Sequence, residues 1–118
     1  MFEVEVYETE SGKSPVREFL RKLTKENKQN EITQIQTCVK LLEEYGMAVN
    51  NVRRHTIRSL DDGLYELRPG NNRVFFFYYI GNKFVLLHAY PKSRQKAPQT
   101  ELKKAKKEMD DYIRRNEK

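Results

Sequence analysis

The sequence contains little that could crosslink the chain or bind a metal. Among 118 residues there is one cysteine, Cys38, and there are two histidines, His55 and His88. A single cysteine excludes an internal disulfide, and one cysteine with two histidines does not form a zinc signature. Because a free thiol is typical of a reducing compartment, we expect a cytoplasmic protein.

Long apolar runs are also missing. No stretch approaches the roughly 20 consecutive apolar residues that a membrane-spanning helix needs. The first ten residues, MFEVEVYETE, are acidic and alternate in polarity, unlike a signal peptide. We therefore expect no membrane partner.

The common catalytic motifs are absent as well. The sequence has no P-loop, no dinucleotide-binding fingerprint, no nucleophile elbow and no cluster of metal ligands. Any catalysis would then depend on individually placed side chains, and we expect no cofactor. RNA suits such a site because its own 2′-hydroxyl can attack the adjacent phosphate.

What the chain does contain is an excess of positive charge. The formal net charge is +6. The length of the chain predicts a single domain, residues 1–118. A small basic domain favours an acidic partner, such as nucleic acid, an acidic protein or an anionic membrane surface. The alternative is a basic protein whose charge only keeps it soluble.

The first half of the chain predicts a strand and two helices. Alternating apolar residues from Phe2 to Val6 predict a half-buried strand. Ser14 and Pro15 fit the N-cap and first position of a helix, and a second helix should end near Tyr45 at Gly46. We expect these helices to form a hairpin over a sheet, followed by a loop over residues 47–62 with room for a short extended piece.

The second half predicts three strands and a last helix. Turn residues at 69–72 and 81–82 separate runs of aromatic and branched residues, and a helix should run from Pro98 to about Asn116. The predicted fold class is α+β: an N-terminal strand, a helical hairpin, a three-stranded antiparallel meander and a C-terminal helix. We expect one sheet with the helices packed on one face.

Alternation along the strands groups three charged residues. Glu66 and Arg68 share one face of the first meander strand, and Arg73 lies on the corresponding face of the second. If the other face packs on the helices, these three side chains share an open surface. Both arginines could bind phosphate and neutralise developing charge, and Glu66 could orient an arginine or act as a general base. The alternative is a set of surface ion pairs that contribute little.

His88 and the loop that follows it are further candidates. His88 could act as an acid or base near neutral pH, or it could be a structural histidine whose parity places it with Leu86 and Phe84. Beyond the third strand, a basic loop offers phosphate contacts unless it is merely solvated. Its candidate residues are Lys92, Ser93, Arg94 and Lys96.

Two aromatic residues of the second meander strand, Phe75 and Phe77, should face the same open surface. Aromatic side chains in that position could stack on RNA bases. The alternatives are a contact with a partner or a second copy, or a place in the core if this face is covered.

These segments together resemble the RelE/ParE superfamily of toxins, and more narrowly its HigB-like branch. The likeness covers nearly the whole chain and is carried by Gly63-Leu64-Tyr65-Glu66-Leu67-Arg68, by Arg73 opening an aromatic strand, by Leu86-Leu87-His88-Ala89-Tyr90 with Lys92, and by Lys96-Ala97-Pro98. It implies a RelE-like fold and a type II toxin that a cognate antitoxin neutralises, usually a HigA-like helix-turn-helix protein. It also implies metal-independent cleavage of mRNA, most often in the ribosomal A site.

The resemblance assigns roles to three residues by position. Arg73 matches the strand arginine that RelE-like toxins use on the scissile phosphate, Arg68 a basic position on the same face, and Lys92 the basic residue after the last strand. The sequence departs from the family where RelE itself has lysines, because it has Leu64 and Glu66 there.

Two further departures leave the acid and the base open. Ser93 stands where a second basic residue is common, and no tyrosine near Pro98 matches the C-terminal tyrosine of RelE. Glu66 and His88 are candidates for proton transfer by chemistry and not by motif.

The sequence thus predicts a ribosome-associated, metal-independent mRNA endoribonuclease whose partners are mRNA, the ribosome and a HigA-like antitoxin. The predicted catalytic residues are Arg73, Arg68, Lys92, Glu66 and His88; the predicted RNA-binding residues are Arg94, Lys96, Ser93, Phe75 and Phe77. Two alternatives stay open: a ParE-like toxin that inhibits DNA gyrase without nuclease activity, and a basic RNA-binding domain without chemistry.

Overall fold

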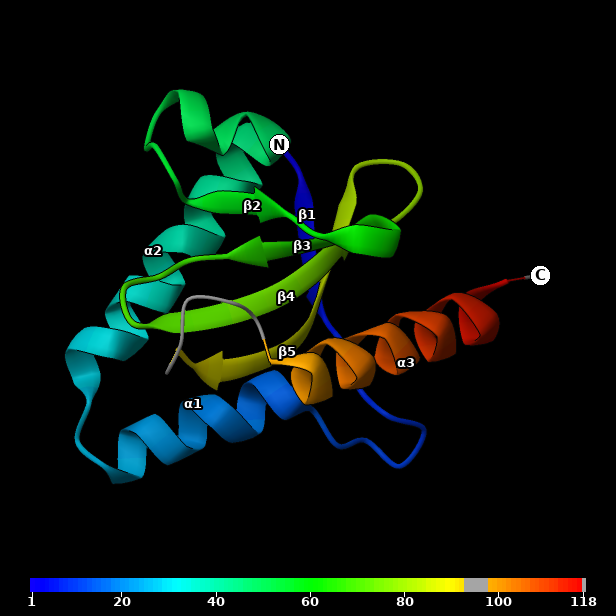
Figure 1. Ribbon diagram of the computed structural model, residues 1–118, viewed down its shortest axis with the longest axis horizontal. Helices are drawn as coiled ribbons and strands as arrows, with labels where there is room; N and C mark the ends of the chain where they lie inside the picture. Colours follow the sequence, from blue (N-terminus) through cyan, green and yellow to red (C-terminus); the bar gives the residue numbers. More distant parts are fainter. Residues whose placement is uncertain (93–97, 118) are drawn as a thin grey trace.

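A computed structural model, which describes residues 1–92 and 98–117, contains one five-stranded sheet and three helices (Figure 1). The strand order is β1-β5-β4-β3-β2; β1 is parallel to β5, and the other pairs are antiparallel. The strands are β1 (Glu3–Val6), β2 (Ile57–Ser59), β3 (Leu64–Leu67), β4 (Asn72–Tyr78) and β5 (Lys83–Pro91). The α-helices are α1 (Pro15–Lys25), α2 (Gln29–Tyr45) and α3 (Gln99–Asn116); η1 (Gly46–Asn51) and η2 (Asp61–Gly63) are short 3₁₀-helices.

This arrangement confirms the predicted α+β class and element order. The segment expected as a loop after α2 contains η1, β2 and η2, and β2 adds a short edge strand to the meander. Over residues 1–92 and 98–117, the structure has no helix that is both long and apolar enough to cross a membrane.

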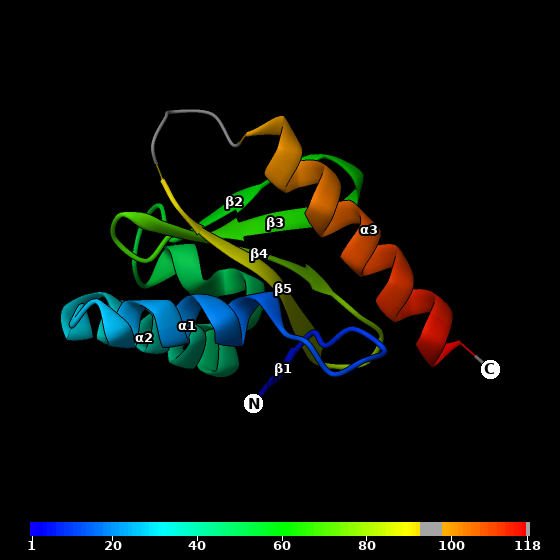
Figure 2. The same cartoon turned by 90° about the horizontal axis from the view of Figure 1, so that it is seen from below.

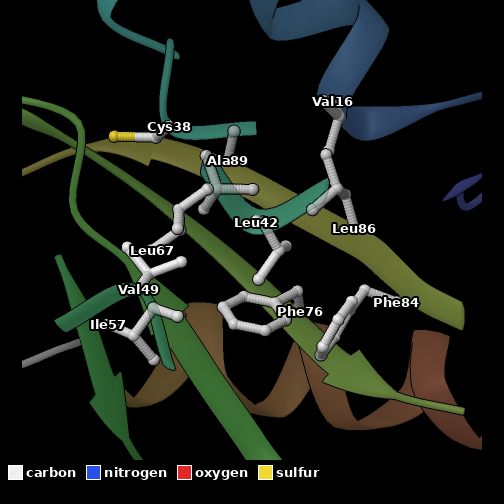
Figure 3. Packing of buried hydrophobic residues seen from close by; sticks show 11 residues of the cluster. Val16, Cys38, Leu42, Val49, Ile57, Leu67, Phe76, Phe84, Leu86 and Ala89 are labelled. Carbon is white, nitrogen blue, oxygen red and sulfur yellow. The ribbon is translucent and has the colours of Figure 1, made fainter. Parts of the chain in front are cut away.

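Helices α1 and α2 cover one face of the sheet. The Ser14 hydroxyl accepts a hydrogen bond from the backbone N–H of Arg17 at 3.2 Å, and Pro15 is the first residue of α1, as predicted. Side chains from both helices pack on the sheet, where Leu42 lies beside Phe76 and Val16 beside Leu86 (Figure 3). The first hydrophobic core therefore lies between this helical hairpin and the sheet.

Helix α3 covers the opposite face (Figure 2). Its residues Ala105, Met109 and Tyr112 form a second core with sheet residues that include Phe75 and Leu87. The expectation that all helices pack on one face is therefore wrong. The physical reason is that β4 and β5 carry apolar side chains on both faces, so both faces must be shielded from water.

A β-bulge between β4 and β5 changes which side chains face α3. Phe75 pairs with His88, but the next residue of β4, Phe76, pairs with Leu86, so Leu87 is an additional residue. Because a bulge interrupts the strict alternation of a strand, His88 faces α3 together with Leu87. The predicted parity of His88 with Leu86 and Phe84 is therefore wrong.

Candidate functional site

The side chain of Glu66 is the centre of a charged group on the α3 side of the sheet. Its Oε1 atom lies 3.8 Å from Nε of Arg68 and 3.8 Å from Nε of Arg73. Its Oε2 atom accepts a hydrogen bond from the hydroxyl of Tyr90 at 3.4 Å, and Tyr90 lies opposite Arg73 in the β4–β5 register. We call these four residues the Glu66 cluster. Strand alternation alone predicted three of its four members.

The two arginines of the cluster differ in how deeply they are buried. Glu66 is 4% exposed and Arg73 is 6% exposed, whereas the side chain of Arg68 is 28% exposed. Nη1 of Arg73 donates to the carbonyl oxygens of Gly70 and Asn72, at 2.8 Å each. Arg73 therefore braces the turn between β3 and β4, and Arg68 is the guanidinium that solvent reaches. The expected open surface is largely covered, because α3 packs on this face.

Burial and neighbouring charges shift the pKa of two members of the cluster, Arg73 and Tyr90. Burial lowers the pKa of Arg73, the nearby charge of Arg68 lowers it further, and Glu66 acts in the opposite direction. Burial raises the pKa of Tyr90, and the charge and hydrogen bond of Glu66 add to this effect. Tyr90 thus stays a neutral phenol that donates to Glu66, while an arginine side chain remains a cation at neutral pH.

A second charged group, the His88 cluster, lies under α3. Nε2 of His88 pairs with the Glu101 carboxylate, and Nδ1 lies 3.6 Å from Oε2 of Glu108. Burial by itself lowers the pKa of His88, but the two carboxylates outweigh burial, so the pKa is raised above its ordinary value. Glu101 also helps to raise the pKa of Tyr90, so the two clusters are electrostatic neighbours.

Phe75 lies between the two clusters in the sheet, because it pairs with Glu66 on one side and with His88 on the other. Phe75 is 0% exposed and Phe77 is 3% exposed. The ring of Phe77 meets that of Tyr112 from α3 with centroids 5.8 Å apart. Stacking of Phe75 and Phe77 on RNA bases is therefore contradicted, since α3 occupies the surface that the bases would need. The alternative in which both rings belong to a covered core is confirmed.

The remaining predicted residues lie after β5. Lys92 is exposed, and its backbone N–H donates to the carbonyl of Asn71 at 2.7 Å, which places it beside the turn that Arg73 braces. Ser93, Arg94 and Lys96 lie outside the described residues. Across 1–92 and 98–117, the structure contains no group of three or more His, Cys, Asp or Glu side chains placed to hold a metal ion.

Three members of the clusters were not found as site residues from the sequence. Tyr90 is brought to Glu66 by the β4–β5 register, which the sequence does not give residue by residue. Glu101 and Glu108 are seven positions apart on α3 and so lie on one helix face two turns apart. This spacing was a usable signal, because both carboxylates flank the apolar stripe of a helix that has to dock on the sheet.

A family model described as "Phage derived protein Gp49-like (DUF891)" matches residues 18–110. The chain belongs to this Gp49-like family. The matched region includes every member of the Glu66 and His88 clusters. The family is one of RelE-like toxins, which makes the protein a toxin of the toxin–antitoxin type and implies an antitoxin as its partner. No curated protein matches the chain.

Proposed function

We propose that this Gp49-like toxin is a HigB-like, metal-independent endoribonuclease that cleaves mRNA on the ribosome, and that a HigA-like helix-turn-helix antitoxin neutralises it. The observation that carries this proposal is the Glu66 cluster, where one buried carboxylate lies between two guanidinium groups. Arg68 is an accessible cation next to the buried carboxylate of Glu66, and a guanidinium in such a position is suited to bind a phosphate group.

The proposed reaction uses the chemistry of RNA itself. The 2′-hydroxyl attacks the adjacent phosphorus, the bond from phosphorus to the 5′-oxygen breaks, and a 2′,3′-cyclic phosphate and a free 5′-hydroxyl result. Arg68 contacts the scissile phosphate and neutralises the charge that develops on it. Arg73 is a positioning residue that acts through Glu66 and the turn, and Lys92 adds positive charge at the same end of the sheet.

Proton transfer is assigned to Glu66 and His88. Glu66 carries the carboxylate nearest to Arg68 and takes the proton of the 2′-hydroxyl. The carboxylates of Glu101 and Glu108 raise the pKa of His88 and so favour its protonated form, which is suited to protonate the leaving 5′-oxygen. For this step the phosphate chain has to reach the end of β5 where both clusters lie close together.

The test is to express the toxin in cells and to map new 5′ ends on total mRNA. Arg68→Ala removes the accessible guanidinium and should lower the cleavage rate about a hundredfold, the usual effect of losing one group that stabilises transition-state charge. Arg21→Ala on the exposed surface of α1 removes the same charge far from the cluster and should leave cleavage unchanged. Copurification with the antitoxin verifies that both variants are folded.

Other outcomes would reject this function. Growth arrest with intact mRNA would favour inhibition of DNA gyrase, which a supercoiling assay would then test. Binding of RNA without any cut by the unaltered toxin would favour an RNA-binding domain without chemistry. Equal cleavage by Arg68→Ala and Arg21→Ala would remove the Glu66 cluster from the mechanism.

A further inference from the structure

A groove lies beside the Glu66 cluster, on the side of Arg58. It has a volume of about 390 Å³ and lies between the β2–η2 segment and the first turns of α3. Figure 2 shows that α3 lies on this side of the sheet. Its polar lining includes Arg58, Ser59, Asp61, Gln99 and Lys103.

The groove is continuous with the Glu66 cluster through Arg58. Arg58 pairs with Glu66 in the β2–β3 register, and its neighbour Ile57 is buried in the core on the α1–α2 side. Because successive side chains of a strand alternate, Arg58 faces the α3 side, as Glu66 and Arg68 do. Residues that are diagonal neighbours on adjacent strands lie about 7–8 Å apart, so Arg58 extends the cationic surface of Arg68 into the groove.

The charges in the groove favour a phosphate-bearing ligand. Arg58 and Lys103 have no ion-pair partner within the described parts of the chain, whereas Lys106 pairs with Asp62 at 2.9 Å. The lining thus holds three cations and two carboxylates, Asp61 and Asp62, and after the Lys106–Asp62 pair the exposed cations Arg58 and Lys103, on opposite walls, outnumber the carboxylate of Asp61. Ser59 and Gln99 add neutral hydrogen-bonding groups, and Leu60 and Leu102 provide apolar contact area.

We propose that this groove binds the RNA nucleotide next to the cleaved phosphate, with Arg58 and Lys103 holding the flanking phosphate. The proposal rests on the proposed function, because it extends the RNA path from Arg68. The groove is comparable in size to a small-ligand pocket, which is enough for one nucleotide. Asp61 on the wall would repel an acidic peptide, but a nucleotide base presents N–H donors that a carboxylate accepts.

The experiment measures binding of a fluorescent single-stranded 2′-O-methyl RNA, which cannot be cleaved because its 2′-oxygens are blocked. The double variant Arg58→Ala/Lys103→Ala removes the two groove cations. The control Arg21→Ala/Lys22→Ala removes the same charge from two exposed positions on α1, on the opposite side of the sheet. Each neutralised phosphate of a single strand contributes about 0.7 to the slope of log affinity against log salt.

The groove variant should bind about tenfold more weakly at 0.15 M salt, with a slope shallower by about 0.7 than that of the unaltered protein, because one phosphate contact is lost. The control should keep both values. Equal losses in the two double variants, or no loss in either, would overturn the proposal. So would a groove variant that loses affinity for the antitoxin and keeps its affinity for RNA, since an acidic protein would then be the occupant.

The experiments distinguish failure of the groove proposal from failure of the proposed nuclease function. If the unaltered toxin binds the 2′-O-methyl RNA through the groove but produces no new 5′ ends in the mRNA of translating cells, the groove proposal stands and the nuclease function falls. If the toxin cuts RNA and the groove variant cuts it with unchanged KM, the groove proposal falls and the nuclease function stands.

Discussion

At the scale of single residues, Glu66 is the group on which the candidate site depends. Its carboxylate is almost fully buried, and so is the guanidinium of Arg73 at 3.8 Å. Burial of a charge is costly unless another charge or a hydrogen bond compensates for it. Burial of the Glu66–Arg73 pair therefore costs desolvation free energy. Removal of one member would leave the buried charge of the other uncompensated.

Glu66→Gln should lower the free energy of unfolding by about 2 kcal/mol, because the neutral amide no longer compensates the buried charge of Arg73. Urea denaturation followed by circular dichroism measures this loss. The matched control is Glu3→Gln on β1, where the side chain is 56% exposed and the change should stay within about 0.5 kcal/mol. Equal stability of the two variants would show that the pair with Arg73 does not stabilise the fold.

His88 should make the docking of α3 depend on pH. Its pKa in the folded protein is raised above the ordinary value of 6.5, chiefly because the carboxylates of Glu108 and Glu101 outweigh burial. A raised pKa contributes stability that is fully present below pH 6.5 and is lost as the pH rises through the folded-state value. The free energy of unfolding should therefore decrease as the pH rises above 6.5, and His88→Gln should show a smaller decrease in the same pH titration of stability.

The sequence predicted the members of the Glu66 cluster that depend only on alternation. Glu66 and Arg68 are two residues apart on one strand, so their shared face follows from the period of the strand. The face of Phe75 was predicted correctly but its exposure was not, and the parity of His88 was predicted wrongly, in both cases for reasons of tertiary structure. The bulge at Leu87 reverses the parity of His88, and α3 covers the face of Phe75 from a distant part of the chain.

At the scale of elements, the end of α2 depends on one glycine. Gly46 has φ +59° and ψ −139°, a conformation that residues with a side chain rarely adopt. A Cβ atom at this position would lie 2.5 Å from Cε2 of Phe2, which packs here at the start of β1. Gly46 therefore both ends the helix and makes room for the N-terminal strand.

Gly46→Ala should lower the free energy of unfolding by about 2–3 kcal/mol, because backbone strain and the contact with Phe2 add together. Gly12→Ala is the matched control: its φ is also positive, +89°, but nothing lies within 4 Å of a Cβ atom there. We expect a loss of about 1 kcal/mol from strain alone. If chemical denaturation gives the same loss for both variants, the contact with Phe2 does not matter.

Local signals explain which elements the sequence predicted. The start of α1 is set by Ser14 and Pro15 within one turn, so no distant residue is needed to define it. Strand β2 has only three residues, and its pairing with β3 is what makes it a strand. Three residues are too few to show a clear alternation of apolar and polar side chains. The sequence therefore did not predict β2 as a strand.

At the scale of the whole molecule, one sheet serves two hydrophobic cores. Leu67 belongs to the core under α1 and α2, and Leu87 belongs to the core under α3. Strand β1 pairs in parallel with β5, more than 75 positions later in the sequence, and forms one edge of the sheet. No turn connects these two strands directly. The sequence therefore predicted strand β1 but did not predict that β5 is its neighbour in the sheet.

Because both cores share β4 and β5, they should unfold together. Leu67→Ala and Leu87→Ala both remove a side chain that is fully buried, one on each side of the sheet, and each should cost about 2–5 kcal/mol. Far-ultraviolet circular dichroism reports the backbone, and near-ultraviolet circular dichroism reports the packing of the seven tyrosines, of which Tyr7, Tyr79, Tyr90 and Tyr112 lie on the α3 side. Both signals should shift to the same lower midpoint in both variants, as a two-state transition requires. If Leu87→Ala moved only the tyrosine signal, α3 would detach separately, and the Glu66 cluster would become exposed before the rest of the fold is lost.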